Sequence, residues 1–263
     1  MRTSPLTSLL LWSLSLCSTA LAKTCPIADT SIIAHTGTPV GKEEVVDGLN
    51  LYVSKPGCTT PKVGVVYLTD VFGIQLAENK LLADSFARAG YLTVAPDLFN
   101  GTPAPSDLND PSFNTTAFLA AHGPSVVEPL IAKAISYLRA AGVGKVAATG
   151  YCYGGRYAFR SVGKGKGADV AFAAHPSLLE DGEILAIDGP ASVAAAETDS
   201  LMPPARRAQI EALLANTTQP YQVALYSGTS HGFGVRANVS EPEQKFGKES
   251  AFFQAVRWFE AWA

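Results

Sequence analysis

The sequence predicts an α/β fold with a mostly parallel central sheet and helices on both faces. Short apolar runs, such as residues 63–68, are typical of strands buried on both faces. Between them lie longer segments with apolar residues at helical spacing, and this alternation of strands and helices favours parallel pairing. With 47% hydrophobic and 16% charged residues, the composition is that of a folded globular chain.

The elements can be placed in order along the chain. Strands are expected at 51–54 (an edge strand of an N-terminal meander), 63–68, 91–95, in the run that begins at Val146, and at 169–174, 191–196 and 221–226. Helices are expected at 77–89, 115–121, 126–141, from 156 onwards, and at 203–215 and 244–262. Gly90 ends the first of these helices, and Pro203 opens a later one in its first turn.

The segment from residue 98 to residue 124 is rich in Pro, Asn, Asp and Gly. An excursion of this length beyond a strand is more often a functional lid than an idle loop. Its residues Phe99, Phe113 and Phe118 predict an apolar acyl or aromatic substrate, with Phe99 as a candidate substrate contact.

The first 22 residues have the features of a signal peptide. Arg2 supplies a positive charge, residues 9–16 an apolar core, and Ala20 to Ala22 a small-residue cleavage site. Cleavage after Ala22 leaves 263 − 22 = 241 residues, so residues 23–263 are expected to form a single secreted domain. An uncleaved anchor is the alternative, although this apolar run is too short to span a bilayer.

The charge of the chain narrows the class of partner. The formal net charge of −3 provides no basic surface for nucleic acid, and the sequence has no second long apolar run that could cross a membrane. Neither a nucleic acid nor a membrane is therefore expected as a partner.

The cysteines and sequons fit an extracellular protein. Of the three cysteines beyond the leader, Cys25 and Cys58 are in loop-like positions and are predicted to form a disulfide, which leaves Cys152 free. A bridge that includes Cys152 is the alternative. Four sequons are candidates for glycosylation, at Asn100, Asn114, Asn216 and Asn238.

Cys152 lies in the pattern Gly-x-Cys-x-Gly-Gly at residues 150–155, between a predicted strand and a predicted helix. This pattern is similar to the nucleophile elbow of α/β-hydrolases, with cysteine in place of the usual serine. The small residues allow the chains to cross at a strained turn, and the start of the following helix favours a thiolate. The alternatives are a buried structural cysteine and a phosphate-binding turn, but no Gly-Lys-Ser/Thr follows.

Two strand ends beyond the elbow carry the candidate partners of Cys152. Asp199 follows one strand and His231 follows the next, which is the chain order of a nucleophile–acid–histidine triad. In this interpretation His231 exchanges protons with the thiol and the leaving group, while Asp199 orients the imidazole. His175 also follows a strand and is the alternative base, whereas His35 and His122 are expected to be surface residues.

Together, the elbow, the stretch Glu-Thr-Asp-Ser-Leu-Met-Pro that ends at Pro203, and Ser-His-Gly-Phe233 resemble the dienelactone hydrolase family of α/β-hydrolases. The resemblance begins near Val63 and continues to the C-terminus. It implies hydrolysis of an ester or lactone through a thioester, with no cofactor and no metal. The backbone N–H groups of Tyr153 and Val71 are expected to form the oxyanion hole.

Two features depart from the bacterial members of this family. Where those enzymes typically have a glutamate that contacts the thiol, this chain has Asp70. Its side chain is one methylene shorter, so its contact with the thiol is expected to be loosened or water-mediated. Arg236 is a candidate for binding a substrate carboxylate, but residues 96–105 contain no arginine, so dienelactone itself is doubtful as the substrate. A surface arginine is the alternative for Arg236.

Two other functional classes compete with an ester hydrolase. One is a catalytically silent protein of the same fold that binds a ligand, since fold alone does not determine function. The other is a glycosidase, which requires two facing carboxylates, and Asp70 with Asp199 is the candidate pair.

Overall fold

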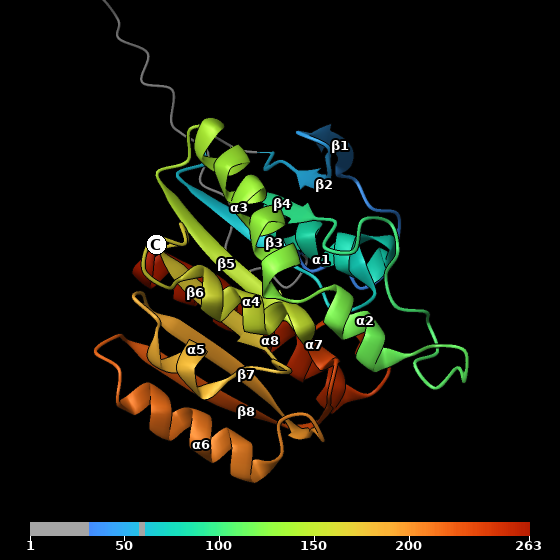
Figure 1. Cartoon of the computed structure of the whole chain (residues 1–263), viewed down its shortest axis with the longest axis vertical. Helices are drawn as coiled ribbons and strands as arrows, with labels where there is room; N and C mark the ends of the chain where they lie inside the picture. Colours follow the sequence, from blue (N-terminus) through green and yellow to red (C-terminus); the bar gives the residue numbers. More distant parts are fainter. Residues whose placement is uncertain (1–31, 58–60) are drawn as a thin grey trace, which may run out of the picture.

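The computed structural model describes residues 32–57 and 61–263 and contains an eight-stranded sheet with helices on both faces (Figure 1). The strands are β1 (Lys42–Val46), β2 (Leu49–Ser54), β3 (Val63–Leu68), β4 (Leu92–Pro96), β5 (Lys145–Tyr151), β6 (Val170–Ala174), β7 (Ala191–Thr198) and β8 (Tyr221–Ser230). Their order in the sheet is β1-β2-β4-β3-β5-β6-β7-β8. All pairings from β4 to β8 are parallel, and β2 pairs antiparallel with both β1 and β4. The prediction of a mostly parallel α/β sheet is therefore confirmed.

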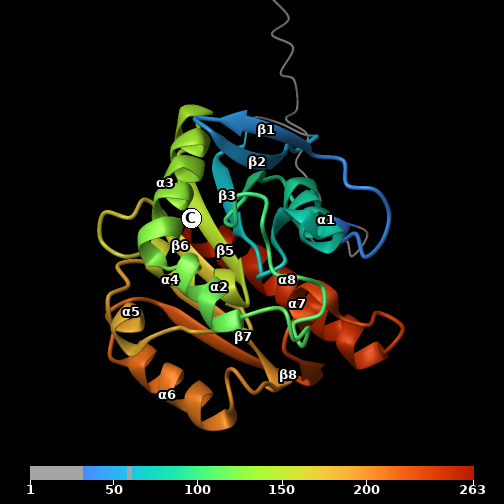
Figure 2. The ribbon, with the colours of Figure 1, turned by 45° about the vertical axis from the view of Figure 1, so that its right-hand side comes forward.

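The helices are distributed over the two faces of this sheet. They are α1 (Ala77–Arg88), α2 (Thr115–Ala121), α3 (Pro124–Ala140), α4 (Tyr153–Ser161), α5 (Asp181–Leu185), α6 (Pro204–Ala215), α7 (Phe233–Arg236) and α8 (Pro242–Trp262), with a 3-10 turn at Gly73–Gln75. Helices α3, α4 and α6 pack on one face, and α1 and α8 pack on the other (Figure 2).

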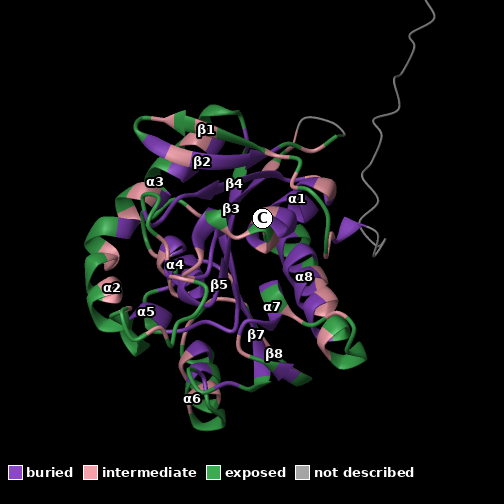
Figure 3. Ribbon diagram, turned by 90° about the vertical axis from the view of Figure 1, so that its right-hand side faces the viewer, coloured by how far each residue is buried: buried purple, intermediate pink, exposed green. Residues whose placement is uncertain are grey.

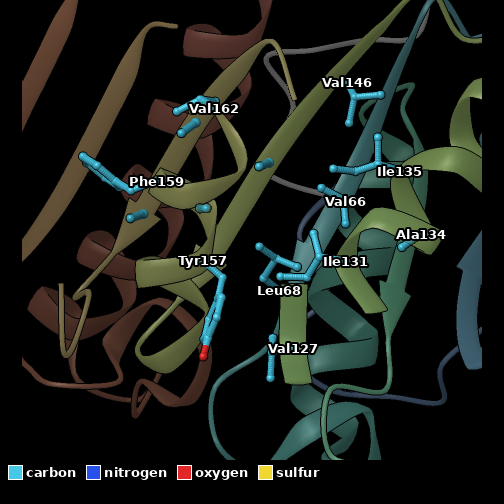
Figure 4. Close-up of a cluster of buried hydrophobic side chains, with 14 of the residues drawn as sticks. Val66, Leu68, Val127, Ile131, Ala134, Ile135, Val146, Tyr157, Phe159 and Val162 are labelled. Carbon is cyan, nitrogen blue, oxygen red and sulfur yellow. The ribbon is translucent and has the colours of Figure 1, made fainter. Parts of the chain in front are cut away.

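Two apolar layers result, because alternate residues of a strand point to opposite faces of the sheet. Val66 and Leu68 of β3 join the layer under α3 and α4, where they lie with Ile131 and Ile135 (Figure 4). Val65, the neighbour of Val66 in the same strand, joins the layer under α1 and α8. Burying each such side chain contributes about 1.5–3 kcal/mol to folding. The central strands are accordingly buried, while the outer faces of the helices are exposed (Figure 3).

Most of the predicted elements occur within a few residues of the expected positions, but residues 51–54 are not an edge strand. They belong to β2, which has a neighbour on each side, and the edge position is taken by β1. The sequence of β1, Lys-Glu-Glu-Val-Val, is mostly exposed and therefore lacks the apolar signal of a buried strand. The short helices α5 and α7 also lacked a periodic signal long enough to predict them.

Several predictions concern the N-terminal part of the chain and the sequons. The leader (residues 1–22), Cys25 and Cys58 lie outside the described residues, so cleavage, secretion and the disulfide stay predictions. The four sequon asparagines are exposed, as glycosylation requires: Asn100, Asn114, Asn216 and Asn238. Their modification also stays a prediction. None of the helices in the described ranges is both long and apolar enough to span a membrane.

Candidate active site

Cys152 lies at the tight turn between β5 and α4. Its backbone has φ 53° and ψ −115°, a strained combination for a non-glycine residue that costs on the order of 1–3 kcal/mol. The flanking glycines are required because a Cβ on Gly154 would lie 2.1 Å from the carbonyl oxygen of Leu68. A Cβ on Gly150 would lie 2.1 Å from the carbonyl oxygen of Gly154. The predicted elbow is therefore present, and Cys152 at its tip is only 7% exposed.

The structure brings Cys152, His231 and Asp199 together. The Nε2 atom of His231 lies 3.0 Å from the Sγ atom of Cys152, and its Nδ1 atom lies 2.8 Å from Oδ2 of Asp199. The other carboxylate oxygen, Oδ1, accepts hydrogen bonds from the backbone N–H groups of Leu201 and Met202, at 2.8 and 3.1 Å. Strands β5, β6, β7 and β8 are consecutive in the sheet, which is why residues following three of them meet at one edge.

The contacts of His231 determine its charge. Burial lowers the pKa of the imidazole, but the hydrogen bonds to Asp199 and Cys152 outweigh this effect and raise the pKa to about 10. The ring is therefore protonated at neutral pH, with a carboxylate on one side and the sulfur on the other. A cysteine attacks as the thiolate, so a charged imidazole beside the sulfur suits a nucleophilic role for Cys152.

His175, the alternative base, occupies a different position. It follows β6 and is fully buried, and its ring centroid lies 5.0 Å from that of His231. Burial lowers the pKa of His175 well below its usual value, and the nearby charges of His231 and Arg236 act in the same direction. Neither ring nitrogen hydrogen-bonds to any residue that the structure describes. His175 is thus a neutral ring packed beneath His231 and is not bonded to the thiol.

His35 and His122 were expected to be surface residues, and each reaches the surface in part while also making contacts within the fold. Both are only partly exposed: His35 bonds to Glu249 across the fold, at 2.8 Å, and His122 packs against Phe118 at the end of α2. Loop position in the sequence carried no information about the contact between His35 and Glu249, which are 214 residues apart.

Asp70 follows β3 and its side chain is fully buried, but it is not hydrogen-bonded to the thiol. Its Oδ1 atom accepts from Nδ2 of Asn79 at 2.8 Å and from the N–H of Phe72 at 3.2 Å. Its Oδ2 atom accepts from Nε of Arg236 at 3.2 Å. Among the described residues, the Cys152 sulfur hydrogen-bonds to Ser177 and His231, so the expected contact of Asp70 with the thiol is not a direct hydrogen bond. The short side chain is held by these three donors instead.

Arg236 was a candidate for substrate binding and is placed near the site by α7. Its guanidinium group bonds to Asp70 and lies over the ring of Phe72, 4.7 Å from the ring centroid. The side chain is 37% exposed. Arg236 is therefore not an unpaired surface arginine, and its contact with substrate stays a prediction.

The two N–H groups expected in the oxyanion hole lie on adjoining segments. Gly154 packs against the carbonyl groups of Leu68 and Thr69, so the elbow touches the chain that leaves β3 and leads to Val71. Tyr153 is the first residue of α4, where an N–H has no partner within the helix. In the described part of the chain, neither the Tyr153 N–H nor the Val71 N–H donates to a protein acceptor.

Phe99 was predicted to contact substrate, but it is 0% exposed. Its ring packs between those of Phe118 and Tyr153, with centroid distances of 5.3 and 5.4 Å. The prediction is corrected, since Phe99 supports the site from within the core.

The predicted lid segment is anchored to α4, because the hydroxyl groups of Tyr153 and Tyr157 both donate to the carbonyl oxygen of His122.

Ser177 also reaches the sulfur, and no sequence motif marked it. Its Oγ atom lies 3.6 Å from Sγ of Cys152, and its N–H donates to the carbonyl oxygen of Cys152 at 3.0 Å. A serine that follows a predicted strand is too common a signal to have identified it.

No group of three His, Cys, Asp or Glu side chains in the described residues is placed to hold a metal ion.

Lys248 of α8 supports α7 and provides a pH-dependent test of this region. It is 4% exposed, and its ammonium group donates to the carbonyl oxygen of Val235 at 2.8 Å. Burial lowers its pKa to about 8. The unfolded chain therefore binds more protons than the folded protein between about pH 8 and pH 10.5, and the contribution of Lys248 to stability rises with pH in this window.

We accordingly expect the unfolding free energy of the wild type to rise relative to that of Lys248→Met by about 2 kcal/mol between pH 8 and pH 9.5. Urea unfolding of both proteins at several pH values measures this difference. Exposed Lys133→Met is the matched control and should show no such change. A difference between wild type and Lys248→Met that stays constant with pH would contradict the assignment.

The model of the dienelactone hydrolase family matches residues 49–263. The chain belongs to the dienelactone hydrolase family. It is 38% identical to the hydrolase pyvD of Aspergillus violaceofuscus over 226 residues, which cover 86% of this chain and 91% of that protein. It is 28% identical to Dienlactone hydrolase 1 of Gibberella moniliformis, with 87% and 90% of the two chains covered.

Solved structures share the fold of this family member. An esterase from Thermogutta terrifontis superimposes with a TM-score of 0.60 at 16% identity, covering 83% of this chain and 94% of the esterase. A dienelactone hydrolase-like phosphotriesterase from metagenomic libraries gives a TM-score of 0.66 at 18% identity, with 86% and 100% covered. At these identities the likeness shows the fold alone, and the family membership shows that the protein is a hydrolase.

Proposed function

We propose that the protein hydrolyses small carboxylic esters or lactones through a thioester formed on Cys152. The observation that carries this proposal is the continuous hydrogen-bonded chain from the sulfur to His231, at 3.0 Å, and on to Asp199, at 2.8 Å. These are the three groups that covalent acyl transfer requires: a nucleophile, a base that exchanges protons with the nucleophile, and an acid that orients the base. Membership of a hydrolase family supports the same reaction class.

The first half-reaction forms the acyl-enzyme. The Cys152 thiolate attacks the carbonyl carbon, and the negative charge moves to the carbonyl oxygen, where the N–H groups of Tyr153 and Val71 are the proposed donors. One such donor lowers the barrier by about 3 kcal/mol. The tetrahedral intermediate then collapses: the carbon–oxygen bond to the leaving group breaks, and the leaving oxygen takes the proton from Nε2 of His231.

The second half-reaction regenerates the enzyme. The now neutral imidazole of His231 accepts a proton from water as the water oxygen attacks the thioester carbonyl. Collapse of the second tetrahedral intermediate breaks the carbon–sulfur bond and releases the carboxylic acid. The sulfur leaves as a thiolate beside the imidazolium, which restores the starting arrangement. Asp199 remains ionised throughout and holds the ring in position.

Turnover of 4-nitrophenyl acetate before and after treatment with iodoacetamide tests this proposal. We expect the untreated enzyme to release nitrophenol catalytically, and activity to disappear in proportion to modification of the Cys152 peptide, measured by mass spectrometry. A ligand-binding protein would be labelled but would not turn over the ester. A glycosidase would hydrolyse a glycoside substrate equally well before and after alkylation. Either result would reject the proposal.

A further inference from the structure

The turn that follows β6 holds the strained backbone of Cys152 in place. The carbonyl oxygen of Ala174 accepts a hydrogen bond from the N–H of Cys152 at 3.1 Å, and the N–H of Ser177 donates to the carbonyl oxygen of Cys152 at 3.0 Å. Pro176 packs so closely that a Cβ on Gly155 would lie 2.8 Å from it. Both backbone polar groups of the cysteine are thus fixed by residues that are distant in sequence.

The same turn also brings a hydroxyl group to the sulfur. Ser177 is only 4% exposed, and its Oγ atom lies 3.6 Å from Sγ of Cys152. In the part of the chain that the structure describes, the sulfur is the one recorded hydrogen-bond partner of this hydroxyl. The sulfur therefore has two polar neighbours, Oγ of Ser177 and Nε2 of His231.

The direction of this hydrogen bond depends on the state of the sulfur. A neutral thiol can donate or accept, but a thiolate can only accept. Next to a thiolate, the Ser177 hydroxyl must therefore be the donor, and hydrogen bonds to charged acceptors are roughly twice as strong as those between neutral groups. In the thioester the sulfur carries no charge and is a weak acceptor, so the stabilisation returns only when the carbon–sulfur bond breaks.

We propose that Ser177 is a further catalytic residue, which donates a hydrogen bond to the thiolate of Cys152. It stabilises the nucleophile in the free enzyme and the departing sulfur during hydrolysis of the acyl-enzyme. This inference rests on the proposed role of Cys152 as nucleophile and adds a donor that the predicted triad does not include.

Other charged or titratable groups face this region and must be considered in any test that varies pH. They come from the segments after β3, β6, β7 and β8 and from α7, and they are Asp70, His175, Asp199, His231 and Arg236. Substituting Ser177 leaves all five in place. A change in the pH profile that is specific to Ser177 variants therefore reports on the hydroxyl group.

The rate of alkylation of Cys152 by iodoacetamide, followed by peptide mass spectrometry from pH 4 to pH 10, tests the proposal. We expect Ser177→Ala to move the midpoint of this profile upward by about one pH unit, and Ser177→Thr, which keeps a hydroxyl, to restore most of the shift. Ser177→Ala should also slow hydrolysis of the acyl-enzyme about tenfold in single-turnover experiments. Both variants keep the backbone N–H that bonds to Cys152.

Ser192→Ala is the matched control. Ser192 is a fully buried serine of β7 whose hydroxyl bonds to Gln254 at 2.8 Å, away from the sulfur. It should lower thermal stability without moving the alkylation midpoint. If Ser177→Ala alkylates with the wild-type profile while the wild type hydrolyses esters, the role of Ser177 is overturned and the proposed function stands. If the wild type has no esterase activity but the midpoint still shifts, the proposed function fails while the Ser177–thiolate hydrogen bond remains supported.

Discussion

Cys152→Ala is expected to lower kcat/KM for 4-nitrophenyl acetate by at least about 10⁴-fold while leaving the protein folded. The substitution removes the only protein atom that bonds to the acyl group in the proposed mechanism, so no acyl-enzyme can form. Alanine is smaller than cysteine and retains the backbone hydrogen bonds to Ala174 and Ser177. Steady-state kinetics with purified protein measure the loss, and circular dichroism and thermal unfolding verify the fold.

The His231→Ala variant tests whether Cys152 and His231 act together in the same catalytic step. Groups that act together in covalent catalysis are not additive, so the double variant Cys152→Ala/His231→Ala should be no less active than Cys152→Ala alone. Retention of more than a tenth of the wild-type activity by Cys152→Ala would show that the chemistry takes place elsewhere.

Gly154→Ala is expected to have the largest effect on stability, about 3–5 kcal/mol or outright failure to fold. Its Cβ would lie 2.1 Å from the carbonyl oxygen of Leu68 and 2.6 Å from that of Thr69. Both atoms belong to the backbone, so no side-chain rotation can relieve the clash. Relief requires α4 to move away from the end of β3, which separates the elbow from Val71. Activity should therefore fall even in the fraction that folds.

Gly182→Ala is the control for this substitution. Gly182 lies in α5, and a Cβ there would meet nothing within 4 Å. Alanine is a better helix former than glycine, so we expect this variant to be as stable as the wild type or slightly more stable. Urea unfolding compares the two. Equal stability of Gly154→Ala and Gly182→Ala would contradict the tight packing of the elbow.

The sequence was sufficient to predict the parts of the site that depend on local patterns and chain order. The glycines around Cys152 mark the strained turn, because only small residues fit where the helix crosses the strand end. Asp199 and His231 each follow a predicted strand, and residues at the carboxyl ends of parallel strands meet at one edge of the sheet. For this reason the sequence alone predicts that the three residues lie together.

The contacts that depend on packing could not be predicted in the same way. Whether Asp70 reaches the thiol depends on the donors around it, and Asn79 and Arg236 hold it elsewhere. Phe99 is an apolar aromatic residue of the kind that often contacts a substrate, but the rings packed against it bury it completely. Ser177 depends on the path of the turn after β6, and a single serine leaves no periodic signal.

The anchoring of residue His122 has a consequence for redesign. Its carbonyl oxygen accepts hydrogen bonds from Tyr153, the residue after the nucleophile, and from Tyr157 one turn later. The excursion from 98 to 124 is therefore not an interchangeable module, even though it lies outside the sheet. A loop transplanted from a relative to change substrate preference must present a carbonyl group at the same point. Otherwise at least one of the two tyrosine hydroxyls, which also bond to each other, will be left buried without an acceptor.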